Sequence, residues 1–95
     1  IGSSPSFAKP MTNLGLILLK KGELAEGKTW LDESQSLDNS DPETYLGLAV
    51  HGRLSGDAVG CEQSLKMAVE RGGKEYLSYF EQALQEAGRR PAATH

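Results

Sequence analysis

The stretch NLGLILL at positions 13–19 decides the fold, because its pattern recurs at one spacing along the chain. A shift of 34 residues aligns it with GLAVHGR at 47–53, and an equal second shift aligns it with EQALQEA at 81–87. The aligned columns include Met11, Tyr45 and Tyr79; Leu14, Leu48 and Gln82; Gly15, Ala49 and Ala83; Gly27 and Cys61; Leu31 and Leu65; and Ser34 and Ala68. One spacing kept without gaps through these columns indicates an internal repeat of a single structural unit.

Length and composition exclude several classes of protein. A chain of 95 residues with a net charge of −3 fits a single domain and argues against a nucleic-acid surface. The single cysteine, Cys61, excludes an intrachain disulfide, and no signal-peptide pattern is visible, so a cytoplasmic location is favoured. The longest apolar run, 14–19, is far shorter than the roughly 20 residues of a membrane span, and we expect no insertion into a membrane.

Local signals predict five helices. Pro10 suits a first helical turn, and the acid–proline–acid sequence at 41–43 marks a helix start. Glycines interrupt the pattern at 22, 56, 72–73 and 88, where helices commonly end. We therefore expect a first helix from about residue 6 or 8 to 21 and further helices at about 24–37, 42–54, 58–70 and 74–87. A flexible lead-in is expected at 1–7 and a frayed tail at 89–95. Because no stretch alternates like a strand, the predicted class is all-α, with five antiparallel helices.

Helix–turn–helix units of 34 residues resemble the tetratricopeptide repeat (TPR). Residues 8–41 match its pattern through Met11, Leu14, Gly15, Leu18, Gly27, Leu31 and Ser34. Residues 42–75 match it through Tyr45, Leu48, Ala49, Gly52, Cys61, Leu65 and Ala68. Residues 76–88 resemble the start of a third unit, in which the polar Gln82 and Glu86 suit a terminal capping helix. The resemblance implies a TPR-like array of helical hairpins, an α-α superhelix.

The small residues of the repeat predict where helices approach closely. Gly15, Gly27, Ser34, Ala49, Cys61 and Ala68 occupy these columns. A larger side chain there would push the two backbones apart. The aromatic residue that the family has near Gly52 is missing, and a glycine inside a helix is expected to cost about 0.5–1 kcal/mol relative to alanine.

Catalytic chemistry is not indicated. His51 and His95 are the only histidines, and Cys61 falls in a small-residue column, where a packed thiol is expected. No phosphate-binding loop, zinc-binding motif, paired cysteines or serine-nucleophile motif is present. We therefore expect no enzyme activity, no catalytic residue, no metal site and no cofactor.

Protein binding is the function that the resemblance implies. The first helices of TPR units line a concave groove, which here would take a peptide or an amphipathic helix. The groove columns correspond to Thr12, Leu16, Leu46, Val50, Arg53, Phe80 and Leu84. Phe80 is the expected hot spot, worth about 2 kcal/mol of binding. The lysine, arginine and asparagine clamp that some members use for a peptide carboxylate is missing. The sequence leaves open whether these apolar residues form a groove or a core.

Three functions remain open from the sequence. The first is an interaction scaffold, the C-terminal part of a larger TPR protein. The second is a small TPR-like chaperone of a secretion or pilus assembly system, and the third is a non-catalytic accessory domain of an enzyme. The run 14–19 is apolar around the whole helix, so earlier repeats, a partner helix or self-association is expected to cover it.

Overall fold

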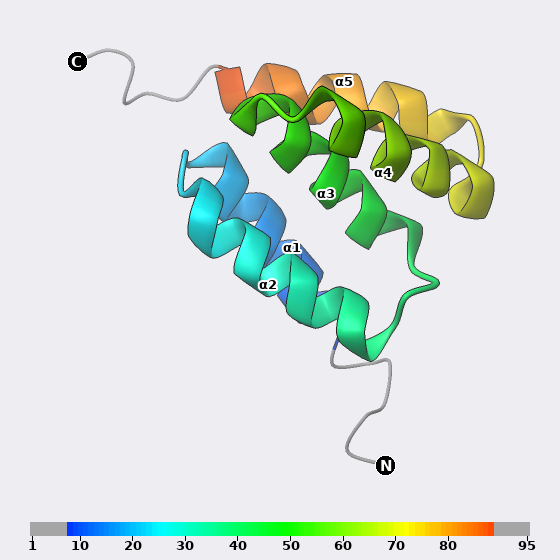
Figure 1. The fold of residues 1–95 in the computed structure, drawn as a ribbon, viewed down its shortest axis with the longest axis horizontal. Coiled ribbons are helices and arrows are strands. Elements are labelled where there is room, and N and C mark those ends of the chain that lie inside the picture. The colour runs from blue at the N-terminus through cyan, green and yellow to red at the C-terminus, as the bar shows by residue number, and fades with distance from the viewer. Residues whose placement is uncertain (1–7, 89–95) are drawn as a thin grey trace.

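A computed structural model describes residues 8–88 and shows five α-helices joined by short turns (Figure 1). The helices are α1 (Ala8–Lys20), α2 (Leu24–Leu37), α3 (Pro42–Ser55), α4 (Ala58–Gly72) and α5 (Glu75–Gly88). The described residues contain no strand, which confirms the all-α class. The predicted lead-in at 1–7 and tail at 89–95 lie outside the described residues.

The helix ends follow the local signals in the sequence. The Asp41 carboxylate accepts a hydrogen bond of 3.0 Å from the backbone N–H of Glu43, and Pro42 begins α3. Asp57 caps α4 in the same way, through a 3.0 Å bond from the N–H of Gly60. A side-chain oxygen that accepts from a free N–H of the first turn stabilises a helix by roughly 1 kcal/mol. Turn chemistry therefore sets the start of both helices.

The helices pack mainly with their neighbours in the chain. The most extensive contacts join α1 to α2 and α3 to α4, so that each predicted 34-residue unit contains one helical hairpin. Helix α5 packs on α3 and α4, and it also reaches back to α1 (Figure 1). The buried core cluster comprises Leu19, Leu31, Leu46, Ala49, Val50, Cys61, Phe80 and Ala83. The division into repeats stays a prediction, but the helices within it are observed.

Close helix approaches occur at the small residues. All six residues predicted from the repeat columns are buried. In the first hairpin, a Cβ atom on Gly15 would lie 3.1 Å from the Gly27 carbonyl oxygen, and one on Gly27 would lie 3.0 Å from that of Gly15. The α1 and α2 backbones therefore meet where the sequence has no side chain on either helix.

Gly52 behaves differently from the sequence-based expectation. A Cβ atom at this position would lie 2.8 Å from the backbone nitrogen of Cys61 and 3.0 Å from the Asp57 carbonyl oxygen. Both atoms belong to the backbone at the start of α4, so neither can rotate away. The sequence-based expectation that alanine would make the chain more stable at this position is therefore wrong, because α3 and α4 leave no room for the methyl group.

Three buried hydroxyl groups join α1, α2 and α3. Thr12 Oγ1 lies 3.0 Å from Thr44 Oγ1, which in turn lies 3.2 Å from Ser34 Oγ, and Ser34 is also hydrogen-bonded to Thr12. The three side chains are almost fully buried. Each hydroxyl group has one proton to donate and two lone pairs to accept, so a closed ring satisfies all three. This ring fixes how the first hairpin sits against α3.

Candidate functional site

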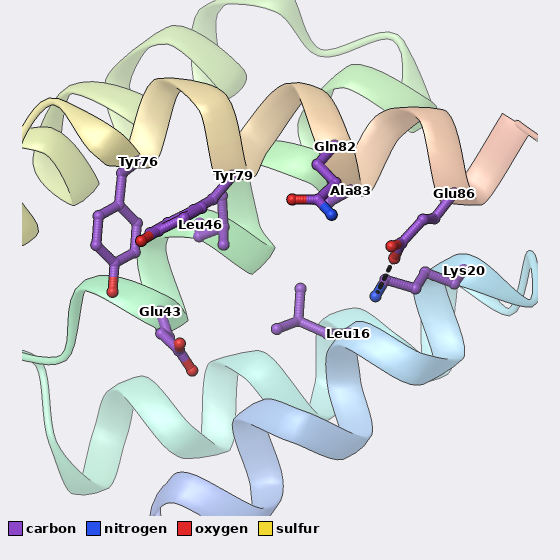
Figure 2. A pocket seen from close by; sticks show the side chains of 9 residues that line it. All are labelled: Leu16, Lys20, Glu43, Leu46, Tyr76, Tyr79, Gln82, Ala83 and Glu86. Atoms are coloured by element: carbon purple, nitrogen blue, oxygen red, sulfur yellow. Dashed lines mark ion pairs between the residues drawn. The ribbon is translucent and has the colours of Figure 1, made fainter.

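The main candidate site is an open pocket between α1, α3 and α5, with a volume of ≈ 430 Å³. We call it the α1/α3/α5 pocket; these are the first helices of the three predicted units. Figure 2 shows the nine residues that line it: Leu16, Lys20, Glu43, Leu46, Tyr76, Tyr79, Gln82, Ala83 and Glu86. Its volume falls within the roughly 300–1,000 Å³ of ligand-binding pockets.

An ion pair closes one end of the α1/α3/α5 pocket. The Nζ atom of Lys20 lies 2.6 Å from a carboxylate oxygen of Glu86, across the gap between α1 and α5 (Figure 2). Both side chains remain about two-fifths exposed to solvent, so the pair stabilises the fold by at most about 1 kcal/mol. The main effect of the ion pair is that the positive charge of Lys20 is neutralised by the carboxylate of Glu86.

Two tyrosines and an acid form the opposite end. The rings of Tyr76 and Tyr79 meet edge to face, with centroids 5.0 Å apart and an interplanar angle of 78°. Glu43 lies beside them on α3, while Leu16 and Gln82 project into the middle of the pocket (Figure 2). Tyr79 is 46% exposed, a large exposure for an aromatic residue, and no further described helix packs over it.

Burial separates the predicted groove residues into two groups. Thr12, Leu46, Val50 and Phe80 are at most 7% exposed and belong to the interior. Leu16 and Leu84 are half-buried, and Arg53 is exposed. The seven residues therefore do not form one open apolar face. Packing of the five helices against one another makes most of their apolar surface part of the core, which is the alternative that the sequence left open.

Sequence reasoning found part of the pocket and missed the rest. Of the predicted residues, Leu16 and Leu46 line it. Tyr76 and Tyr79 were not predicted, although their spacing of three places both on one face of a helix. Gln82 and Glu86 were expected as polar residues of a capping helix, and both are exposed, but here they face α1. No local signal connects Lys20 with Glu86, because they are far apart in the chain.

A second pocket, with a volume of ≈ 420 Å³, lies between α3, α4 and α5. Arg53, Phe80 and Cys61 line it, together with Ala58, Glu62 and Leu65. Arg53 and Phe80, two of the predicted groove residues, thus line a different pocket from Leu16. Cys61 is buried, and burial raises the pKa of its thiol, opposed by the positive charge of Arg53. A thiol that is buried and protonated is a poor nucleophile.

We expect Cys61 to react slowly with a chromogenic disulfide reagent. At mildly alkaline pH the native chain should react at least about tenfold more slowly than the chain in guanidinium chloride, because folding both covers the sulfur and keeps it protonated. Stopped-flow absorbance measures both rates. Equal rates in the native and unfolded states would show that the thiol is accessible and would make it a candidate functional group.

The outer face of α1 carries exposed apolar side chains. Leu14 and Ile17 are 37% and 49% exposed. Helix α2 and the α1/α3/α5 pocket cover other faces of α1, and within residues 8–88 no element covers this one. Self-association or a partner helix on this face stays a prediction.

His51 is a titratable side chain that lies outside these pockets. His51 lines a polar recess with Lys28 and Asp32, and burial, followed by the charge of Lys28, lowers its pKa. The imidazole is therefore neutral at pH 7. Within residues 8–88, no three histidine, cysteine or acidic side chains gather closely enough to hold a metal ion.

Comparisons with known proteins leave the family open. No protein-family model matches the chain, and neither a curated protein nor a solved structure is significantly similar to it. Among the described helices, none has the length and apolar character that crossing a membrane requires. The function must therefore be argued from the geometry of the chain itself.

Proposed function

We propose that this chain is a TPR-like protein-interaction module that binds a peptide segment of a partner in the α1/α3/α5 pocket. The observation that carries the proposal is the open pocket itself, which three helices line and which contains the exposed Tyr79 ring. Tyrosine is enriched in protein interfaces because it combines a large apolar surface with a polar end and few rotatable bonds.

The packing around the pocket supports this proposal. Leu46 and Ala83 form its floor and belong to the buried core, so the floor is held by the same contacts that stabilise the fold. Leu16, Tyr79 and Gln82 project above that floor and stay accessible. A partner would meet a preformed surface, which lowers the entropy cost of binding. The pocket has room for one or two side chains rather than the whole face of a helix.

The proposal predicts that blocking the pocket abolishes peptide binding. Random dodecapeptides displayed on phage would be selected against the folded chain, and the selected peptides titrated into isotope-labelled protein. Amide shifts in NMR spectra should cluster on α1, α3 and α5 around the pocket. A Gln82→Trp substitution should weaken binding by at least about tenfold, because the indole ring would fill the space that the peptide needs.

Gln85→Trp is the matched control. Gln85 is also an exposed glutamine of α5, but it does not line the pocket. It should therefore retain full affinity, and both variants should retain the helical circular dichroism spectrum. Shifts that cluster on the outer face of α1 around Leu14 and Ile17, with affinity unchanged by Gln82→Trp, would contradict the proposed site.

A further inference from the structure

The Glu43 carboxylate has no ion-pair partner among the side chains of residues 10–87. Glu43 is half-buried at the tyrosine end of the α1/α3/α5 pocket, and its side chain makes no hydrogen bond with these residues either. The other two charged groups of the pocket, Lys20 and Glu86, neutralise one another at the far end. Among the pocket's charged side chains, Glu43 alone has no ion-pair partner within residues 10–87, and its charge is negative.

Acidic neighbours also act on the Tyr76 hydroxyl at this end of the pocket. Burial raises the pKa of the Tyr76 hydroxyl, and the charges of Glu43, Asp41 and Glu75 raise it further. Burial disfavours any charge at this site, whereas the negative charge of Glu43 favours a cation over an anion. The faces of Tyr76 and Tyr79 act in the same direction, since the π-face of an aromatic ring attracts a cation.

We propose that this end of the pocket binds the cationic side chain of a lysine or arginine in the partner peptide, an inference that rests on the proposed function. The ammonium or guanidinium group pairs with the Glu43 carboxylate and lies against the tyrosine rings. Its aliphatic stem packs along Leu16 in the middle of the pocket (Figure 2).

Other kinds of side chain fit this end less well. An acidic side chain would be repelled by Glu43, and the Lys20 charge that could attract it is matched by Glu86. A purely apolar side chain would cover Glu43 and remove water from its carboxylate without supplying a partner, which is costly. Only a cation both removes the uncompensated charge and uses the aromatic faces.

A charge-swap cycle tests the inference. The peptides selected on the wild-type chain should share a basic residue at one position. Replacing that residue with its uncharged analogue, citrulline for arginine or acetyl-lysine for lysine, should weaken binding to the wild-type chain by about tenfold. In a Glu43→Gln chain, isothermal titration calorimetry should show a much smaller preference for the basic peptide, because only the tyrosine rings then favour the cation.

Glu26→Gln is the control for overall charge. It makes the same change in net charge at an exposed position of α2, outside the pocket, and should keep the full preference for the basic peptide. A preference that stays undiminished in Glu43→Gln would overturn the assignment to Glu43. Peptides that shift the pocket amides without any shared basic residue would overturn the inference while supporting the proposed function. A library without any binder at the pocket would contradict both.

Discussion

Truncation of Phe80 to alanine is expected to destabilise the fold by about 3–5 kcal/mol. The Phe80 ring is 6% exposed and packs in the core cluster together with Val50 and Cys61. Removing it leaves a cavity beneath α5, and α5 has few other large anchors. Because small domains have total stabilities of about 5–15 kcal/mol, this variant should lose a large part of its unfolding free energy in a urea titration followed by circular dichroism.

Tyr79→Ala is the matched control for this experiment. Tyr79 precedes Phe80 on the same helix but is 46% exposed, so its truncation should cost less than about 1 kcal/mol of stability. The same substitution should weaken the binding of selected peptides, since Tyr79 lines the pocket. A stable Phe80→Ala chain with reduced peptide affinity would instead support the sequence-based hypothesis that Phe80 is the binding hot spot of the groove.

Replacement of Gly52 by alanine is expected to destabilise the chain by about 2 kcal/mol. The added methyl group gains about 1 kcal/mol of helix propensity, but it collides with the backbone of Asp57 and Cys61 and forces α3 away from α4. Overpacking of this kind costs about 1–3 kcal/mol, and a contact with rigid backbone belongs at the upper end. The urea midpoint should therefore fall, although alanine is the better helix former.

Gln63→Ala is a suitable control, because Gln63 is exposed on α4 and its substitution should change stability by less than about 0.5 kcal/mol. An increase in the stability of Gly52→Ala would show that α3 and α4 are farther apart than the structure places them. It would also restore the sequence-based expectation that this glycine only weakens its helix.

The elements of the fold could be predicted because their signals are local. A carboxylate at Asp41, a proline at 42 and a glycine at 22 act on the backbone within one turn, so their effects do not depend on the rest of the chain. The 34-residue period also identified the small residues at the helix contacts, such as Ala49 and Ala68, which are fully buried. Class, helix order and most close approaches therefore follow from the sequence alone.

The site could be predicted only in part, because it depends on how closely helices that are distant in the chain pack against one another. A repeat pattern states which columns share a face, but not whether that face is open. Packing of α5 on α3 and α4 buries Val50 and Phe80, while the contact between α1 and α5, with the Lys20–Glu86 ion pair, leaves an open pocket near Tyr79. The sequence by itself thus determined the helices and the packing columns. The angle between units, a sum of many weak contacts between distant residues, decided which columns became core and which became surface.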